Sequence, residues 1–317
     1  MSNGYHIPVL RKEAVDALIT TADGVYVDGT LGGGGHAEAI AKKIFPNGLL
    51  IGIDADADAI AEAQRRFSAT TDFQQFIGSG HIILVHDNVS NIQAILRQRN
   101  VRQIHGLLLD IGVSSFQLDE GSKGFSFRTN DALDMRMDKR QTLDARTVVN
   151  TYSEQELARV FWRYGEEKSS RRIARAIVEH RAHRRIETTG ELAFVVEEKA
   201  SGKFFVKTLA RVFQALRIEV NHELENLSNT LRETMEVLAA GGRIVVISYH
   251  SLEDRIVKNF FQVEAADKVS SGHKLLPDMP RVPRLRVITK KPIIASDEEQ
   301  LQNPRSRSAK MRAAERL

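Results

Sequence analysis

The sequence predicts an α/β protein of the Rossmann-like, doubly wound type, with an all-helical domain inserted into its sheet domain. Short apolar runs alternate with helix-forming segments as far as Gly112, and this alternation resumes only beyond Arg217. The length of 317 residues agrees with two domains, or with one large domain that carries an insertion, at roughly 150 residues per domain.

Several short apolar runs end in a polar or acidic residue and are expected to be buried strands. They are too short for core helices and are rich in Ile and Val. They occupy residues 25–28, 49–54, 82–87, 106–112 and 243–250. Helical patterns at 36–44, 56–67 and 91–99 separate the first four runs. Continuous apolar strands joined by helices predict a parallel sheet that is covered on both faces.

The region between the fourth and fifth runs contains helical patterns only. These patterns lie at 154–164, 168–183 and 191–200, and from Phe205 onward. We therefore expect residues 1–114 and 216–317 to form the sheet domain and residues 115–215 to form the inserted helical domain. A helix at 219–238 precedes the fifth strand, and residues 286–291 offer a further strand near the C-terminus.

Composition excludes several classes of protein. The absence of cysteine excludes disulfide scaffolds, thiolate zinc sites and cysteine nucleophiles. No apolar run approaches the ~18 residues of a membrane span, and the first residues lack the apolar core of a signal peptide. The histidines are scattered, without a closely spaced pair beside carboxylates, so no metal site is predicted. We expect a cytoplasmic protein without membrane contact, and the sequence indicates no oligomeric state.

The positive charge of the chain is concentrated near its C-terminus. The net charge is +4, but residues 281–317 alone carry a net charge of +6. A basic tail on a nearly neutral body favours a polyanionic partner such as nucleic acid, and a solvated, frayed terminus is the alternative. In the helical region, Lys168, Arg171, Arg172 and Arg175 share one helix face, which suits either a phosphate backbone or a solvated surface.

A glycine turn at residues 32–35 connects the first strand to the helix that begins near His36. Glycines let a backbone approach a ligand closely, and a helix N-terminus presents free N–H groups. No Gly-Lys-Ser/Thr follows, so a Walker-type phosphate loop is excluded. A tight turn without any ligand is one interpretation of this segment.

A dinucleotide is the second interpretation of the glycine turn. Gly32, Gly34 and Ala37 satisfy the pattern G-x-G-x-x-A, and Asp54 lies where a ribose-binding acid is expected. This match predicts a nicotinamide-dependent oxidoreductase.

S-adenosylmethionine is the third interpretation. Methyltransferases of the Rossmann-like class carry an acid at the end of the first strand and then glycines at alternate positions. Asp28, Gly32 and Gly34 fit this spacing, although Thr30 replaces the usual first glycine. Asp28 would repel the pyrophosphate of a dinucleotide, whereas it would attract the sulfonium and ammonium groups of S-adenosylmethionine.

Longer motifs indicate a family. In chain order they are DGTLGGGGH, GLLLDIGVSSFQLD, GFSFR, LDMRMD, YGEE, FQALRIEVNHEL, GGRIVVISYHSLEDRIVK and NPRSRSAKMRAAER. From His6 to Arg316 the chain resembles the bacterial MraW/RsmH family of S-adenosylmethionine-dependent 16S rRNA (cytosine-N4)-methyltransferases. The resemblance implies a class I methyltransferase sheet domain, S-adenosylmethionine as cofactor and a decoding-centre cytidine of the small ribosomal subunit as target.

The resemblance also implies a set of cofactor contacts. Besides Asp28, they are Gly34, Gly35, His36, Asp54, Val89, Asp110 and Gln117. Val89 departs from the family, because relatives often have Phe there, so aromatic packing on the adenine is lost or supplied elsewhere. The segment 202–218 lacks the His-Pro of relatives, which affects the start of a helix rather than the site.

The residue types also limit the chemistry. Methylation of cytosine at carbon-5 normally requires a cysteine nucleophile, which this chain lacks. Methylation of the exocyclic amine requires only hydrogen-bond acceptors and alignment with the methyl donor. Asp110, Ser114 and Ser115 follow the fourth strand and are the predicted catalytic residues that hold the amine. In the alternative, Asp110 contacts only the cofactor and the serines cap the next helix.

Substrate contacts are expected at the same edge of the sheet and in the tail. His250 and Arg255 follow the fifth strand, and Arg305 and Arg307 belong to the basic tail. In the alternative, His250 is a turn residue and residues 253–255 are charges at a helix start. The inserted domain is a second candidate for RNA recognition, and a non-catalytic ribosome-assembly factor with this fold is the remaining functional alternative.

Overall fold

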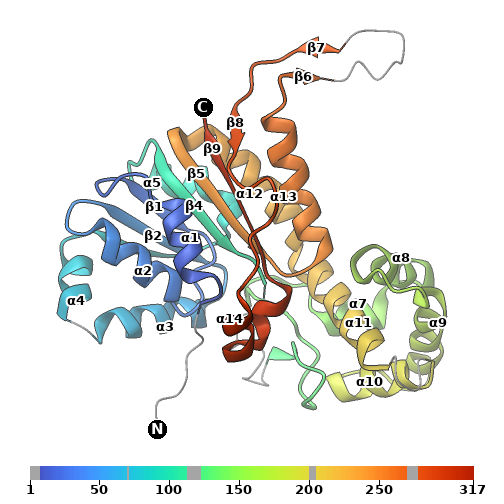
Figure 1. Cartoon of the computed structure of the whole chain (residues 1–317). Coiled ribbons are helices and arrows are strands. Elements are labelled where there is room, and N and C mark those ends of the chain that lie inside the picture. The colour runs from blue at the N-terminus through green and yellow to red at the C-terminus, as the bar shows by residue number, and fades with distance from the viewer. Residues whose placement is uncertain (1–7, 70, 113–122, 200–204, 270–277) are drawn as a thin grey trace. The chain divides into compact units, whose positions relative to one another are not determined.

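The computed structural model of the chain describes residues 8–69, 71–112, 123–199, 205–269 and 278–317. The chain folds as two compact units (Figure 1). One unit comprises Met1–Gly112 with Glu225–Leu317, and the other comprises Val113–Leu224. Each unit has apolar clusters of its own, so each forms a separate core.

The first unit is built on a seven-stranded sheet with the order β3-β2-β1-β4-β5-β9-β8. The strands are β1 (Val25–Asp28), β2 (Leu49–Asp54), β3 (Ile82–His86), β4 (Ile104–Asp110), β5 (Leu238–Ser248), β8 (Leu285–Val287) and β9 (Lys310–Arg316). Strands β1 to β5 are parallel, whereas β9 runs antiparallel to both of its neighbours. The predicted α/β fold is confirmed. Because the strand order reverses between β1 and β4, ligands are expected at the carboxyl ends of these strands.

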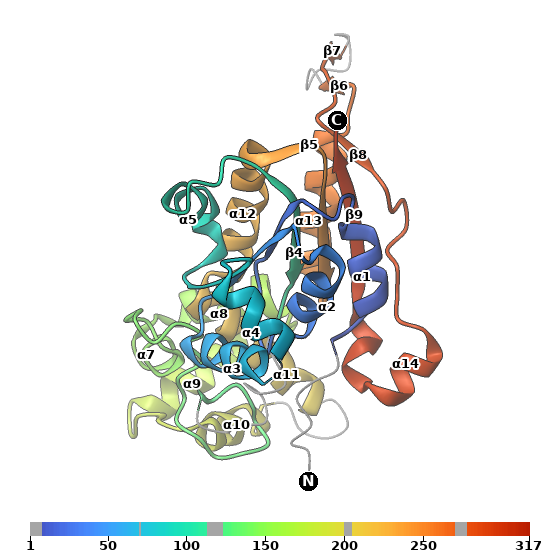
Figure 2. The same ribbon diagram turned by 90° about the vertical axis from the view of Figure 1, so that its left-hand side faces the viewer.

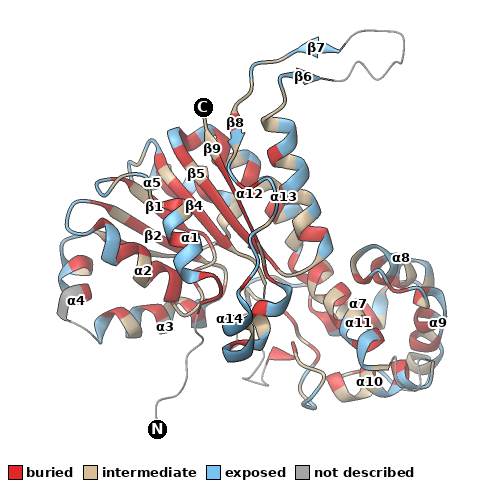
Figure 3. Ribbon diagram, viewed as in Figure 1, coloured by how far each residue is buried: buried red, intermediate tan, exposed pale blue. Residues whose placement is uncertain are grey.

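Helices cover both faces of this sheet (Figure 2). One face packs against α1 (Arg11–Leu18), α2 (Gly35–Ile44), α3 (Ala57–Ser68) and α4 (Thr71–Gly78). The other face packs against α5 (Ile92–Gln98), α12 (Glu223–Val237) and α13 (Ser251–Glu264). Alternate residues of β4 serve the two faces, with Leu108 on the first and Leu107 and Leu109 on the second. The central strands β1, β2, β4 and β5 are therefore buried over most of their length (Figure 3).

The sheet unit also contains several short elements. They are η1 (Val89–Asn91), β6 (Lys268–Val269), β7 (Met279–Pro280), α14 (Asp297–Gln302) and η4 (Pro304–Ser308). Within the described residues, strands β6 and β7 form a separate two-stranded sheet. Among the described residues, no helix combines the length and the apolar composition that a membrane span requires.

The second unit is helical. Its helices are α7 (Ala145–Thr151), α8 (Glu154–Gly165), α9 (Ser170–Arg181), α10 (Thr189–Glu197) and α11 (Phe205–Asn221). Capping boxes start α8 at Ser153 and α10 at Thr188. Helix α11 continues through residue 216, where the sequence predicted the return to the sheet domain. Its apolar side, up to Val220, packs in the helical core, so the second boundary lies after Leu224.

The C-terminal segment is part of the sheet rather than a frayed tail. Residues 310–316 form β9, which inserts between β5 and β8. The buried Arg312 guanidinium donates to Asp254 Oδ1 on α13 at 2.6 Å, and Glu315 accepts from Arg243 at 3.0 Å and also from Arg286. Arg312 and Arg286 of the predicted basic tail therefore form ion pairs with acids of the same unit.

We expect Arg312→Ala to lower the free energy of unfolding by roughly 3–5 kcal/mol, because Asp254 would keep a charge without its buried partner. Urea denaturation followed by circular dichroism measures this change. Arg286→Ala, which breaks a solvent-exposed pair on the same sheet, should cost under ~1 kcal/mol. Equal small losses for both variants would contradict the docking of β9 through Arg312.

Candidate active site

The glycine turn after β1 has the backbone that its sequence requires. Gly32 and Gly34 have φ values of 49° and 77°, in the left-handed region that favours glycine. Gly34 is the N-cap of α2, and a side chain at Gly35 would come within 2.3 Å of Pro8 Cγ. The turn thus brings the start of α2, with His36 in its first turn, close to the ends of the central strands.

Asp54, at the end of β2, holds this turn in place. The Gly32 N–H donates to Asp54 Oδ2 at 2.8 Å, and the Asp56 N–H donates to Asp54 Oδ1 at 2.8 Å. Each carboxylate oxygen can accept two hydrogen bonds, so these contacts are compatible with the predicted contact to ribose hydroxyls. Asp54 therefore combines a structural role in the loop with a position suited to ligand binding.

Asp28, at the end of β1, is a fully buried acid. The Thr30 N–H donates to its Oδ1 at 3.3 Å, whereas its Oδ2 has no hydrogen-bond partner in the part of the chain that the structure describes. Burial raises the pKa of this carboxyl to about 7, although the nearby His36 opposes the shift. A buried carboxylate with one oxygen that lacks a hydrogen-bond partner is suited to a cationic ligand, so the sulfonium and ammonium of S-adenosylmethionine fit this position.

Asp110, at the end of β4, is the centre of a polar cluster. Its Oδ2 lies 3.4 Å from Nε2 of the buried His36, and its Oδ1 accepts from the Tyr249 hydroxyl at 2.7 Å. Burial acts to lower the pKa of His36, but the Asp110 and Asp28 carboxylates outweigh burial and raise it. Burial, followed by Asp110, raises the pKa of Tyr249 well above its usual range, so this phenol remains a donor. The Asp110 N–H donates to Thr30 Oγ1 at 2.6 Å.

Tyr249 is the site residue that sequence reasoning missed. It directly follows β5, and β5 pairs with β4 so that Ile247 lies opposite Asp110. A residue just beyond the end of β5 is therefore a neighbour of the residue that ends β4. The prediction that the fourth and fifth strands end at the same edge of the sheet contained this signal, but the phenol contact itself depends on tertiary structure.

His250 and Glu253 form the start of α13. His250 is the N-cap of this helix, with its Nε2 2.9 Å from Glu253 Oε1, and the two residues form a capping box. The buried Glu253 also accepts the Tyr249 N–H at 2.8 Å. His250 thus caps a helix, and its contact with the substrate stays a prediction, whereas Arg255 is exposed on α13.

The remaining predicted residues lie in different surroundings. Val89 is half-buried in η1, and a side chain at Gly29 would come within 2.6 Å of it, so Val89 packs beside the end of β1. In η4, Arg305 is half-buried and Arg307 is exposed. Three predicted residues lie outside the described residues, namely Ser114, Ser115 and Gln117.

The raised pKa of Asp28 predicts a pH-dependent stability. Because the folded-state pKa exceeds the ordinary value of 3.8, the folded chain retains a proton that the unfolded chain releases between pH ~4 and ~7. Stability from this group is therefore complete below pH ~4 and is lost as the pH rises to ~7. Without added ligand, Asp28→Asn should stabilise the protein at pH 8 by roughly 2–4 kcal/mol, and this gain should shrink toward pH 4.

Urea denaturation across this pH range measures the effect. Asp23→Asn is the matched control, because Asp23 is exposed and the Thr21 hydroxyl lowers its pKa. This control should give no stabilisation at any pH. Parallel pH profiles for the two variants would contradict a buried, protonatable Asp28.

Comparison with known proteins identifies the family. The family model described as the MraW methylase family matches residues 3–317. A protein of Dehalococcoides mccartyi named ribosomal RNA small subunit methyltransferase H is 46% identical over 323 residues, covering 100% of this chain and 88% of the relative. A protein of the same name from Clostridium botulinum is 44% identical over 319 residues, covering 98% and 99%.

The solved structures that match are less similar to this chain than the sequence relatives are. An rRNA methylase from Streptococcus thermophilus has a TM-score of 0.41 and 9% identity, covering 97% of this chain and 93% of the other. A Streptococcus mutans protein solved in complex with SAH has a TM-score of 0.44 and 9% identity, covering 97% and 95%.

The sequence relatives decide between the interpretations of the glycine turn. The dinucleotide pattern of Gly32, Gly34 and Ala37 does not make the protein an oxidoreductase, since the family match spans the whole turn and nearly all of the chain. The chain belongs to the MraW methylase family and is an S-adenosylmethionine-dependent methyltransferase.

Proposed function

We propose that the chain transfers the methyl group of S-adenosylmethionine to the exocyclic N4 of a cytidine in 16S rRNA of the small ribosomal subunit, at the decoding centre. The observation that carries this proposal is the nearly full-length similarity to relatives named ribosomal RNA small subunit methyltransferase H. The substrate implies action in the cytoplasm, where small subunits are assembled.

The proposed cofactor site uses the glycine turn and the acids beside it. S-adenosylmethionine supplies an electrophilic methyl group on a sulfonium. Asp28 attracts the positive groups of the cofactor, Asp54 accepts from the ribose hydroxyls, and the loop backbone approaches closely at Gly34 and Gly35. Val89 also belongs to the proposed cofactor contacts, as does Gln117, which lies outside the described residues. The orphaned Asp28 Oδ2 supports this arrangement.

Asp110 is the residue proposed to hold the target amine. The lone pair of a cytosine amine is delocalised into the ring, so an acceptor for the N–H groups favours a tetrahedral, more nucleophilic nitrogen. The Tyr249 hydroxyl and His36 restrict the Asp110 carboxylate, and positioning of this kind accounts for large rate effects. The same carboxylate is the proposed acceptor of the proton that the methylated nitrogen loses, and Ser114 and Ser115 are proposed to contact the base.

Contacts with RNA are proposed at basic residues of both units. The exposed Arg255 and Arg307 are proposed to contact phosphates, with the half-buried Arg305 at their side. His250 is proposed to present an edge to the substrate while it caps α13. The helical unit is proposed to recognise RNA outside the target cytidine.

Product analysis tests the reaction directly. Small ribosomal subunits treated with the enzyme and methyl-labelled cofactor should yield N4-methylcytidine, and no 5-methylcytidine, after nuclease digestion. Liquid chromatography with mass spectrometry separates these isomers. Recovery of 5-methylcytidine would contradict the mechanism. Absence of label in the RNA would favour the non-catalytic assembly factor.

Tyr249→Phe tests the proposed role of Asp110. Loss of a hydrogen bond to a charged group should lower kcat on small subunits by roughly 10- to 100-fold, while the KM for S-adenosylmethionine changes little. Tyr152→Phe is a matched control, because the Tyr152 hydroxyl donates to Glu219 at 2.9 Å within the helical unit. This control should leave kcat unchanged. A rise in KM for the cofactor with constant kcat would instead restrict Asp110 to cofactor binding.

A further inference from the structure

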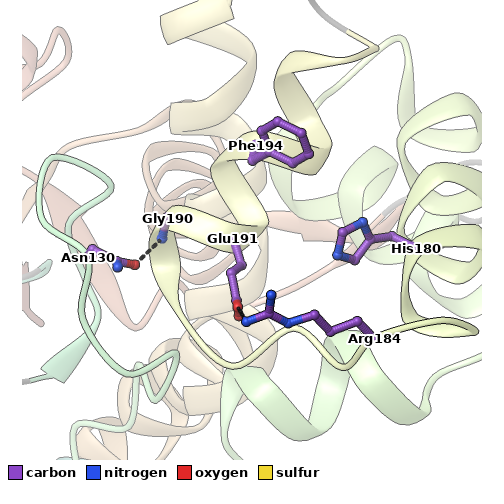
Figure 4. Close-up of a pocket in the computed structure, with 6 residues that line it drawn as sticks. All are labelled: Asn130, His180, Arg184, Gly190, Glu191 and Phe194. Atoms are coloured by element: carbon purple, nitrogen blue, oxygen red, sulfur yellow. Dashed lines mark hydrogen bonds and ion pairs between the residues drawn. The ribbon is translucent and has the colours of Figure 1, made fainter.

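The helical unit contains a hollow that the proposed reaction does not use. It has a volume of ≈ 330 Å³, at the lower end of the range of ligand sites. Residues from three segments line it: Asn130, His180, Arg184, Gly190, Glu191 and Phe194. Figure 4 shows His180 and Arg184 extending from α9 and the segment after it toward α10, which carries Glu191 and Phe194.

Phe194 gives this hollow an aromatic surface. Its side chain is 56% exposed, although it belongs to a helix whose other large apolar residues, Leu192, Val195 and Val196, are buried in the core. The ring therefore contributes little to the helical core. An exposed aromatic face is the feature on which RNA-binding proteins stack unpaired bases.

The polar groups of the hollow are arranged around the start of α10. Asn130 Oδ1 accepts the Gly190 N–H at 3.2 Å, which orients the side-chain amide nitrogen as a donor. Thr188 Oγ1 accepts the Glu191 N–H at 3.2 Å, and the Asp131 carbonyl accepts the Thr189 N–H at 2.9 Å. Because these N–H groups at the start of α10 already donate to acceptors within the chain, any attraction for an anion must come from side chains.

Arg184 is the side chain suited to an anion. Its guanidinium donates to Glu191 Oε1 at 2.8 Å, but the Arg184 side chain is 77% exposed, and an exposed ion pair contributes little. Glu191 Oε2 accepts the N–H groups of Glu187 and Thr188, at 2.8 and 3.2 Å, and these bonds lower the pKa of Glu191. Glu191 thus keeps its hydrogen bonds when Arg184 turns toward a phosphate.

We propose that this hollow binds one unstacked nucleotide of single-stranded RNA, distinct from the nucleotide that is methylated. The base stacks on Phe194, the Asn130 amide and the His180 imidazole contact polar edges of the base or sugar, and Arg184 contacts the phosphate. The inference rests on the proposed function in one respect, namely that the substrate is RNA. An acidic peptide is the competing ligand, and it would depend on Arg184 but not on an aromatic ring at position 194.

Binding of a fluorescently labelled single-stranded RNA octanucleotide to the full chain, followed by anisotropy, tests the site. Phe194→Ala should weaken binding by about tenfold, because stacking on one aromatic side chain is worth roughly that factor or more. Phe194→Trp should retain the affinity, whereas Phe194→Leu, which keeps apolar bulk without a π face, should behave like Phe194→Ala.

Arg184→Gln tests the phosphate contact against a matched control. Arg140→Gln removes the same charge from an exposed residue of the same unit, where the guanidinium pairs with Asp138 as that of Arg184 pairs with Glu191. Arg184→Gln should weaken binding more than Arg140→Gln and should reduce the log–log salt slope by about 0.7. Unchanged circular dichroism and unchanged calorimetric affinity for S-adenosylmethionine should show that each variant is folded.

The kinetics on small subunits separate this inference from the proposed function. Phe194→Ala should raise the KM for small subunits by about tenfold and leave kcat unchanged. RNA binding that depends on Phe194, with no methylation of small subunits, would contradict the proposed function and support the site. Equal affinities of Phe194→Ala and the unsubstituted chain, or equal effects of Arg184→Gln and Arg140→Gln, would overturn the site, as would acidic-peptide binding that is insensitive to Phe194→Ala.

Discussion

The sheet unit depends on the placement of buried charge at the ends of β1 and β4. Asp28 and Asp110 are neighbouring acids, with one buried His36 to balance them and one Tyr249 hydroxyl to donate. Two carboxylates with little solvent around them are costly for a fold. Gly34, which has a positive φ, is the N-cap of α2, and His36 lies in the first turn of this helix beside the two acids. The conformation of the glycine turn therefore positions the imidazole that balances their charge.

The first turn of α13 connects this charge balance to the C-terminal strand. Tyr249 donates its hydroxyl to Asp110 and its N–H to Glu253, which also caps the helix with His250. One residue later, Asp254 pairs with Arg312 of β9. The SYHSLEDR motif is thus a continuous set of contacts that runs from Asp110 at the end of β4 to β9, which lies between β5 and β8.

The sequence predicted the elements whose signal is local. Strands β1, β2, β4 and β5 are mostly buried, so their apolar runs are continuous, and Asp28, Asp54 and Asp110 lie at the ends of three of them. Strand β9 was not predicted because its sequence, KMRAAER, is mostly charged and contains no run of Ile, Leu or Val, although Met311, Ala313 and Ala314 are buried. Only tertiary structure shows that the Arg312 charge is internal. Tyr249 was also not predicted, because its hydroxyl donates to Asp110 at the end of the neighbouring strand β4, which is distant along the chain.

The residues with proposed functions differ in burial between the two units. In the sheet unit, the polar groups are buried and mutually dependent, so a change in one alters both the fold and the site. In the helical unit, Phe194 and Arg184 are exposed and peripheral to the core, so changes there should have little effect on stability. A reaction without a covalent enzyme intermediate depends on the alignment of two reactants. The hydrogen bonds that fix Asp110 and the glycine turn supply the rigidity that this alignment requires, whereas adaptable surface contacts are suited to the proposed binding of a large substrate.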